Sequence, residues 1–598
     1  MTKAVKGIWN LTCICVRGRG GRIGLVYCAI VLMLNLAEIQ IALRMIAWNK
    51  DFYGALEKYD AYAAVWQIGV FGILTGLSAS QYLIATYIRQ LLQIRWRTTL
   101  TTEMLDAWMK NKAYWHINTG DASLLDNPDQ RISEDCRVFV ERLVGGGSSM
   151  GGASGNVLDF MTALVGLTNY VVLLWNLSSF SIGFSVAGYA VRIEHYMVWA
   201  APLYVLISSG LTHWLGAPLM RLNVWQKRRE ADMRFALTRF RESKEAIALE
   251  DGEAAERRII DLRYASVVEN WRKQIKRELI LGCFTRPYYQ TVLRIPLFLA
   301  FPAYFAGHVA IGGLMQLSSA FQRVVTSLSW FIFSYKSLAD LAATSKRIDG
   351  FLAEARRAAT LPTGVAFSRS PDGALHIRDL RVEDPQGRPL LRSGALDVKR
   401  GEAVWIDGPS GIGKSTLIKA ISGLWQHCSG SVEMPEGKKL FLPQYAYLPL
   451  GTLAAAVSYP EGSDAASVRG LLTDVGLGHE RHLEQLNGAE EMPLDYKLSG
   501  GEQQRLIVAR ILSLKPDWVF MDEATSALDA DSEFKLYELL RAALPDAGFI
   551  VAAHREPHGL GSYRRVALRA WCDAARMEMR AGSEAEAVVE SEAKAEAA

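Results

Sequence analysis

The first 340 residues alternate long apolar stretches with long polar ones, whereas the rest of the chain carries short apolar runs separated by glycine-rich turns. A helix needs about 20 mostly apolar residues to cross a lipid bilayer. Six stretches approach or reach that length, and they predict six membrane-spanning helices, of which the last two are the more polar. The predicted spans are 23–47, 63–88, 156–177, 196–217, 287–308 and 315–340.

Positive charges set the expected orientation of these spans. Lysine and arginine gather on the cytoplasmic side of membrane helices, and several of them precede the first span. We therefore expect a cytoplasmic N-terminus, and six spans return the chain to the same side. The polar segments 89–155 and 218–286 then lie in the cytoplasm, where their helical pattern would extend the spanning helices. The basic residues before the first span are Lys3, Lys6, Arg17, Arg19 and Arg22.

The change of pattern also divides the chain. Its 598 residues are too many for one hydrophobic core, so at least two domains are expected. We predict a transmembrane α-helical domain at 1–340, a linker at 341–372, a soluble α/β domain at 373–572 and a disordered tail at 573–598. The tail is rich in alanine and glutamate, a composition that buries too little apolar surface to fold.

Charge and cysteine content exclude some classes of partner. The net charge of +4 is small for this length and gives no case for nucleic acid. The seven cysteines show no repeated metal-ligand spacing, so free thiols are a better interpretation than zinc ligands. The partners that the pattern does favour are a lipid bilayer and whatever the soluble domain binds.

The first functional motif of the predicted soluble domain is a phosphate-binding loop. The segment 408–415 (GPSGIGKS) follows a strand-like run at 403–406 and leads into a helix. Glycines let backbone N–H groups point at phosphate oxygens, and the helix N-terminus adds positive potential. Lys414 is expected to reach the β- and γ-phosphates of ATP, and Ser415 to ligate Mg²⁺. The expected nucleotide-binding residues are Gly408, Pro409, Ser410, Gly411, Ile412, Gly413, Lys414, Ser415 and Thr416.

Two acidic residues end a buried-strand pattern at 518–521. Asp522 is expected to hold Mg²⁺ through water. Glu523 is expected to orient and polarise the attacking water, because phosphoryl transfer depends mostly on positioning and charge stabilisation. An ordinary strand end with solvated acids is the alternative, and the segment 526–529 (SALD), which follows at once, argues against it.

The segment 498–503 (LSGGEQ) resembles the signature of the ABC ATPases. In that family the signature binds the γ-phosphate that the opposite subunit holds, so the resemblance implies that Ser499, Gly500 and Gly501 contact nucleotide in this way, together with Asp529. The chain has one phosphate loop, one signature and six predicted spans. It is therefore expected to be half a transporter that forms a homodimer, although a heterodimer stays open.

Two further positions match the family by their place relative to these motifs. Gln444 matches the glutamine that senses Mg²⁺ and contacts the membrane domain, and His554 matches the histidine that contacts the γ-phosphate. We expect Glu523, His554 and Gln444 to be catalytic, and Ser415, Gln444 and Asp522 to form the metal site. One departure is visible, since 381–385 (RVEDP) has no aromatic residue to stack on adenine.

Polar residues inside the predicted spans bear on the cargo. Charges at the centre of a spanning helix are unfavourable by roughly 2.5–3.5 kcal/mol on insertion scales, so they face a polar cavity or a partner. Their number favours a wide hydrophilic cavity, while the alternative is that they mark membrane interfaces and single structural hydrogen bonds. The residues are Glu38, Arg286, Gln290, Arg294, Gln322 and Arg323.

Four segments narrow the resemblance: 48–53 (WNKDFY), 126–132 (DNPDQRI), 423–425 (GLW) and 441–450 (FLPQYAYLPL). They resemble the SbmA/BacA-related ABC transporters, which are also similar to the peroxisomal fatty-acyl and cobalamin transporters of subfamily D. The resemblance implies an exporter-type ABC fold fused to a P-loop ATPase domain, in a multi-pass protein of the bacterial inner membrane with the ATPase domain in the cytoplasm.

The same resemblance implies the cargo. Bacterial members of this group take up antimicrobial and other peptides, so we expect ATP-driven import of peptides or other hydrophilic cargo. Three alternatives remain open at this point. They are export of lipid, drug or peptide, transport of an acyl-CoA or cobalamin-like cargo, and a channel-like membrane protein that ATP regulates.

Overall fold

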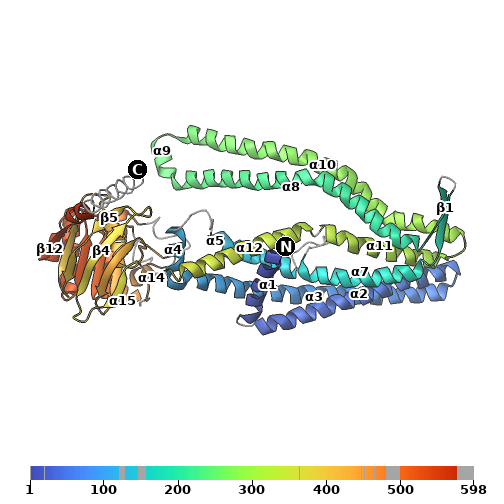
Figure 1. Cartoon of the computed structure of the whole chain (residues 1–598), viewed down its shortest axis with the longest axis horizontal. Helices are drawn as coiled ribbons and strands as arrows, with labels where there is room; N and C mark the ends of the chain where they lie inside the picture. The colour runs from blue at the N-terminus through green and yellow to red at the C-terminus, as the bar shows by residue number, and fades with distance from the viewer. Residues whose placement is uncertain are drawn as a thin grey trace, which may run out of the picture. The chain divides into compact units, whose positions relative to one another are not determined.

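The computed structural model divides into two compact units, Met1–Ala359 and Thr360–Ala598. Figure 1 shows that the first unit is built mostly of long helices and that the second carries the two larger sheets. The structure describes residues 2–18, 21–119, 128–145, 156–186, 189–333, 335–361, 364–445, 447–449, 452–462, 465–479 and 498–575.

The first unit contains helices of up to 53 residues, together with one two-stranded antiparallel hairpin. The hairpin is β1 (Ser181–Val186) with β2 (Tyr189–Glu194). The helices are α1 (Thr2–Arg17), α2 (Gly21–Glu57), α3 (Ala61–Met109), η1 (Lys110–Lys112), α4 (Ala113–Thr119), α5 (Pro128–Gln130), the π-helix η2 (Arg131–Asp135), α6 (Cys136–Val144), α7 (Val157–Leu177), α8 (Tyr196–Glu242), α9 (Lys244–Leu249), α10 (Glu253–Phe305), α11 (Ile311–Phe333) and α12 (Tyr335–Ala358).

Local chemistry fixes where several of these helices begin and how closely they pack. The Asp60 side chain accepts a hydrogen bond from the Ala63 amide and caps α3, and the Asn156 side chain caps α7 in the same way through Asp159. Helices α2 and α11 approach closely at Gly312, where a Cβ atom would overlap the carbonyl oxygen of Lys50. Glycine at this position therefore sets the contact between the two helices.

Only some of the predicted spans lie on helices that are both long and apolar enough to cross a bilayer. Among the described residues, α2, α7 and the helical stretch that starts with α3 are long and apolar enough to span a bilayer. The predicted spans at 196–217 and 287–308 lie on the much longer helices α8 and α10, and the apolar part of α10 is the short stretch Arg294–Phe305. The polar residues and prolines in these helices lower their hydropathy. The predicted span 315–340 is divided between α11 and α12.

The expected linker at 341–372 is mostly regular structure. Helix α12 continues to Ala358, and a strand begins at Ala366. The helix persists because Leu341, Ile348 and Leu352 recur at helical spacing and are buried against α1, α3 and α6. The boundary between the two units falls at Ala359, within the range where we expected the linker.

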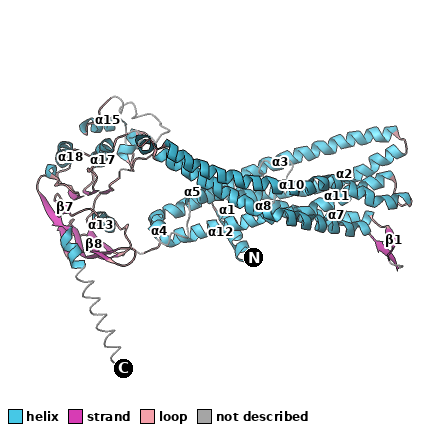
Figure 2. Cartoon of the chain, turned by 90° about the horizontal axis from the view of Figure 1, so that it is seen from above, coloured by secondary structure: helices cyan, strands magenta, loops and turns pink. Residues whose placement is uncertain are grey.

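The second unit contains a parallel sheet and a mostly antiparallel sheet (Figure 2). The parallel sheet has the order β12-β7-β11-β10-β9, and the other has the order β3-β8-β4-β5, with β6 beside β4. The strands are β3 (Ala366–Arg369), β4 (Leu375–Glu383), β5 (Pro389–Arg392), β6 (Ala395–Val398), β7 (Ala403–Asp407), β8 (Cys428–Met434), β9 (Lys439–Leu442), β10 (Trp518–Asp522), β11 (Gly548–Ala552) and β12 (Tyr563–Ala567).

Both faces of the parallel sheet are buried. On β10, Val519 and Met521 face one hydrophobic core, while Trp518 and Phe520 face the other. Because parallel strands covered on both faces read as continuous apolar runs, this strand could be recognised in the sequence. The helices of this unit are α13 (Lys414–Ile421), α14 (Leu453–Ser458), α15 (Ala465–Asp474), α17 (Gly500–Leu514), α18 (Ala530–Ala543) and η4 (His558–Leu560).

Candidate functional site

The carboxyl ends of three neighbouring parallel strands bring the candidate residues together. Strands β7, β11 and β10 lie side by side and end at Asp407, Ala552 and Asp522. The chain continues from these ends into the phosphate loop, to His554 and to Glu523. Ligands of open α/β sheets bind at this edge, so the topology alone places the three segments at one site.

The phosphate loop depends on glycine for its backbone conformation. Gly411 and Gly413 have φ angles of +78° and +108°, in the region that favours glycine. A Cβ atom on Gly413 would also lie 3.2 Å from Cδ1 of Leu391. Helix α13 starts at Lys414, directly after the loop, so its free N–H groups and positive end face the loop. This arrangement fits phosphate.

Lys414 is the buried cation of the site, with its side chain 4% exposed. Its Nζ donates to the carbonyl oxygen of Gly408 at 2.8 Å and lies 3.4 Å from Oε1 of Glu523. The ring nitrogens of His554 lie 3.2 and 3.4 Å from the same Nζ. An ammonium buried this deeply needs anionic partners, and among the described residues its ion pair is with Glu523.

Glu523 connects the predicted catalytic residues. Its Oε2 accepts a hydrogen bond from Nε2 of Gln444 at 2.9 Å, and its Oε1 lies 3.0 Å from Nε2 of His554. Its φ angle is +50°, which is uncommon outside glycine, and its amide is held by the carbonyl oxygen of Ala552 at 2.8 Å. The backbone is therefore fixed in a strained conformation that aims this carboxylate at Lys414, Gln444 and His554.

Ser415 and Asp522 form the candidate metal site. The Ser415 hydroxyl donates to Oδ1 of Asp522 at 2.9 Å, and Asp522 is 6% exposed. Burial raises the pKa of Asp522, the nearby Glu523 carboxylate raises it further, and the Ser415 bond opposes the change. A divalent cation would relieve this destabilisation of the carboxylate. The described residues contain no cluster of three or more His, Cys, Asp or Glu ligands.

The signature residues lie at the start of α17. Ser499 caps the helix through a reciprocal pair of hydrogen bonds with Glu502, and Gly500 and Gly501 form its first turn. A Cβ atom on either glycine would lie 3.6 Å from Ala527. Among the described residues, no hydrogen bond or ion pair joins Lys414 to Ser499, Gly500 or Gly501.

Asp529 caps the next helix. Its side chain accepts a hydrogen bond from the amide of Ser532 at 2.9 Å, and this bond lowers the pKa of the exposed Asp529 carboxyl. Its neighbour Ala527 donates to Oε1 of Gln504 at 2.7 Å, and Nε2 of Gln504 donates to Ser526 at 3.3 Å. The side chain of Gln504 thereby ties α17 to the segment 526–529.

Sequence reasoning missed Gln504, and it also missed Arg510. The Arg510 side chain is buried, and its guanidinium donates to the carbonyl oxygen of Ala456 at 2.9 and 2.7 Å and to that of Tyr447 at 2.9 Å. It connects α17 to the segment that follows Gln444. A lone glutamine or arginine has no pattern of its own, so the usable signal was its position on the buried face of a helix that starts at a recognised motif.

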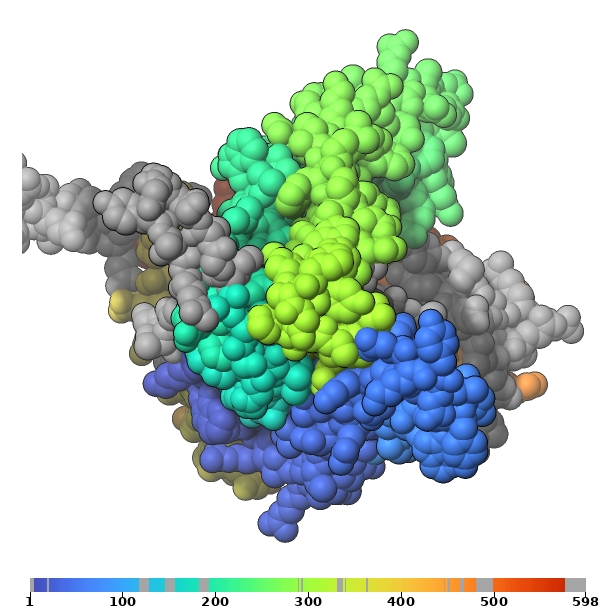
Figure 3. Space-filling model, turned by 90° about the vertical axis from the view of Figure 1, so that its right-hand side faces the viewer, coloured from blue at the N-terminus to red at the C-terminus, as the bar shows by residue number. Residues whose placement is uncertain are grey.

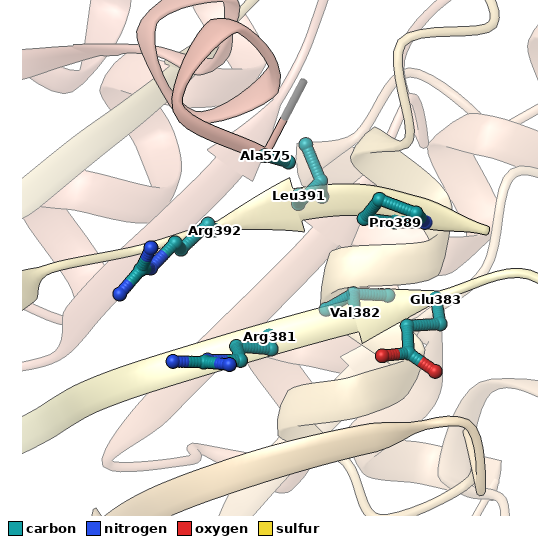
Figure 4. Close-up of a pocket in the computed structure, with 7 residues that line it drawn as sticks. All are labelled: Arg381, Val382, Glu383, Pro389, Leu391, Arg392 and Ala575. Atoms are coloured by element: carbon teal, nitrogen blue, oxygen red, sulfur yellow. The ribbon is translucent and has the colours of Figure 1, made fainter. Parts of the chain in front are cut away.

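The region without the expected aromatic residue borders a cavity of about 200 Å³. Figure 4 shows its residues on adjacent strands β4 and β5, with Ala575 beside Leu391. Arg381 on β4 and Arg392 on β5 lie directly opposite each other in the antiparallel register of the two strands. The described lining contains no aromatic side chain, in agreement with the sequence. The lining residues are Arg381, Val382, Glu383, Pro389, Leu391, Arg392 and Ala575.

Comparison with known families assigns both halves of the chain. Residues 11–305 match the family described as ABC transporter transmembrane region 2. Residues 391–526 match the family described as ABC transporter, a range that contains the phosphate loop, the signature and both acids at the end of β10.

Individual relatives cover nearly the whole chain. The inner membrane ABC transporter ATP-binding protein YddA of Escherichia coli is 30% identical over 540 residues, covering 88% of this chain and 91% of that protein. An uncharacterised ABC transporter ATP-binding protein of Haemophilus influenzae is 31% identical over 529 residues, covering 88% and 86%. The human lysosomal cobalamin transporter ABCD4 is 25% identical over 593 residues, covering 92% of each chain.

Proposed function

Because this chain belongs to the ABC transporter family, as a half-transporter related to YddA and to subfamily D, we propose that it imports peptides at the expense of ATP. Its fold joins a helical membrane domain to an ABC ATPase domain with α/β sheets. ATP binding and the membrane location follow from that membership. The cargo, the direction of transport and the role of each residue are the parts that we propose.

The observation that carries the proposal is the cluster around Glu523. One carboxylate is in reach of Lys414, Gln444 and His554, at the edge of the sheet where the phosphate loop lies. We assign to Lys414 the binding of the β- and γ-phosphates, to Glu523 the positioning and polarisation of the attacking water, and to His554 and Gln444 the γ-phosphate contact and the sensing of the metal. The ion pair between Lys414 and Glu523 would open as Lys414 turns to the phosphates.

Mg²⁺ fits the same site. Ser415 and Asp522 offer hard oxygen atoms 2.9 Å apart, and the raised pKa of Asp522 reflects a buried carboxylate without enough positive charge beside it. Bound there, the ion would neutralise charge on the phosphates of the substrate ATP. Ser415 would be a direct ligand, Asp522 would act through water, and Gln444 would be the third member of the site.

A second copy of this chain would complete the site. Ser499 caps the N-terminal end of α17, and Gly500 and Gly501 form its first turn. A twofold pair could place the signature of each copy on the phosphate loop of the other, which gives two equivalent sites. The homodimer is the economical arrangement because one polypeptide carries both halves of the interface.

Peptide cargo is supported by the resemblance of segments such as 441–450 to the SbmA/BacA-related transporters and by the polar residues of the membrane domain. Exposed Glu38 and Arg323 on α2 and α11 favour a hydrophilic passage over a lipid-handling one. The name of YddA supports the bacterial inner membrane as the location. The relative named as a lysosomal cobalamin transporter favours a second candidate, import of a large polar cobalamin-like cargo.

The test is uptake of a labelled proline-rich antimicrobial peptide by bacteria that lack their own peptide importer. Cells producing the wild type are compared with cells producing Glu523→Gln at matched level. We expect uptake in the first and its loss in the second. Equal uptake in both would mean that hydrolysis at Glu523 does not drive import. Uptake in neither, with labelled cobalamin entering instead, would favour the second candidate.

A further inference from the structure

Four charged side chains gather inside the membrane domain, on α2, α3, α7 and α11. An NH2 group of Arg89 lies 3.1 Å from Oδ1 of Asp159 and 3.3 Å from Oδ1 of Asn35. Asn35 is 4% exposed and donates to the hydroxyl of Thr162 at 3.1 Å. These bonds join three helices, and they tie the partly buried pair Arg89 and Asp159, whose side chains are 15% and 26% exposed, to the buried Asn35.

The other two charges, Glu38 and Arg323, differ in their exposure. Both side chains are exposed on the isolated chain, on helices that pack against each other. They lie within electrostatic reach of each other, and Glu38 also feels the pair Arg89 and Asp159. Figure 3 shows the blue residues of α2 and α3 beside yellow-green residues from the end of α10 and from α11. The exposed surface of this helix pair therefore carries both a carboxylate and a guanidinium.

The free energy of placing charges in hydrocarbon argues that lipid does not cover this surface. An exposed charge at the centre of a span is unfavourable by roughly 2.5–3.5 kcal/mol even on the scales that give the smallest values. The surface must therefore border water, the second copy, or both, which is where the cargo of a dimeric half-transporter has to pass.

We propose that Glu38 and Arg323 form a paired-charge site for a zwitterionic polypeptide cargo. Glu38 receives an ammonium or guanidinium group of the peptide, and Arg323 receives its terminal carboxylate. A cargo with one sign of charge would leave the other side chain unpaired in a poorly solvated passage, which is unfavourable. This assignment rests on the proposed function and specifies its substrate class. The partly buried pair Arg89–Asp159 holds α3 and α7 together beside Glu38.

The experiment measures peptide binding to the full-length protein in nanodiscs by fluorescence anisotropy. The probe is a labelled octapeptide with one lysine and a free C-terminal carboxylate, and its twins carry either an acetylated lysine or a C-terminal amide. We expect Arg323→Gln to weaken binding of the free-acid probe at least tenfold and to change binding of the amide twin less than threefold. Glu38→Gln should weaken binding of the probe with the free lysine at least tenfold and should change binding of the acetylated twin less than threefold.

Two further variants keep the outcome interpretable. The exchange Glu38→Arg with Arg323→Glu should restore binding of the original probe to within threefold, which a misfolded protein could not do. Asp51→Asn, at an exposed acid further along α2, is the matched control and should bind as the wild type does. Equal weakening of all three probes by the single variants, or no recovery in the exchange, would overturn the site.

Failure of the site and failure of the proposed function give different results. If the wild type takes up peptide in cells and the single variants bind all three probes as it does, the paired-charge site is wrong and the function stands. If the wild type binds the probes with the predicted charge dependence but cells take up no peptide, the import function is wrong and the site stands. A wild type that binds no probe overturns the site.

Discussion

A buried carboxylate joins the last helix of the first unit to the π-helix η2. The Oδ1 and Oδ2 atoms of Asp135 accept two hydrogen bonds from Arg347 on α12, at 2.6 and 2.8 Å, and Oδ2 lies 3.0 Å from Arg131. Asp135 is 6% exposed, while the Arg347 side chain is 39% exposed. These bonds therefore hold η2 against α12. The perturbation that tests this contact is Arg347→Ala.

The size of the effect follows from burial. Breaking a fully buried ion pair by removing one partner destabilises a protein by roughly 3–5 kcal/mol. Here Arg131 remains beside the carboxylate and water already solvates part of Arg347, so we expect about 2 kcal/mol. Arg356→Ala is the matched control on the same helix. It removes a pair with Glu103 in which both side chains are exposed, at 58% and 43%, so it should change stability by less than about 1 kcal/mol.

Hydrogen–deuterium exchange of the full-length protein reads this difference locally, without assuming that a two-unit chain unfolds in one step. A loss of about 2 kcal/mol corresponds to roughly 30-fold faster exchange of the amides of η2 and α6. Arg347→Ala should show that acceleration at 131–144, and Arg356→Ala should change exchange there by less than about fivefold. Equal exchange in the two variants would refute the reasoning, since the bidentate bonds of Asp135 would then contribute nothing.

Three further predictions follow from particular residues. Burial raises the pKa of Asp135, but hydrogen bonds from Arg347 and Arg131 outweigh burial, so the pKa is lowered. The stabilisation from this carboxylate is present above pH about 4 and is lost as the pH falls below that value. Hydrogen exchange at 131–144, corrected for the intrinsic rate, should therefore accelerate only below pH about 4. Gly413→Ala should weaken binding of a fluorescent ATP analogue about tenfold or more because of the φ angle of +108°, whereas Gly470→Ala, in an open helical position, should bind normally. Arg510→Met leaves two backbone carbonyl oxygens without their donor and should lower the temperature at which ATPase activity is lost. Arg505→Met removes only a 3.4 Å contact with a serine hydroxyl and should lower that temperature less. Equal effects of the two variants would contradict the role of the buried guanidinium.

The sequence was most informative where local pattern and chemistry coincide. The phosphate loop lies between a short apolar strand and a helix start, and the two acids end an apolar run, so both motifs predict their own structural setting. The structure has β7 before the loop, α13 after it and Asp522 at the end of β10. The ABC membership and the two-part architecture could be predicted for the same reason.

Features that depend on packing could not be predicted. We predicted a linker from residue 341, but the apolar positions of 341–358 pack as one face of α12. The bonds of Gln504 and Arg510 connect elements far apart in the chain, and neither side chain belongs to a local motif. Likewise, Glu38 and Arg323 are 285 positions apart, and only the packing of α2 on α11 brings their charges into range of each other.

The central claim is that ATP hydrolysis at Glu523 moves peptide toward the side of the ATPase domain. The most direct measurement uses proteoliposomes with the same concentration of labelled peptide inside and outside, to which MgATP is added from outside. Only molecules with an outward-facing ATPase domain can then act. Import into the cytoplasm corresponds to loss of peptide from the lumen, and Glu523→Gln should abolish this loss. Accumulation of peptide in the lumen would show export, and loss at the same rate in wild type and Glu523→Gln would show that the ATPase does not drive transport.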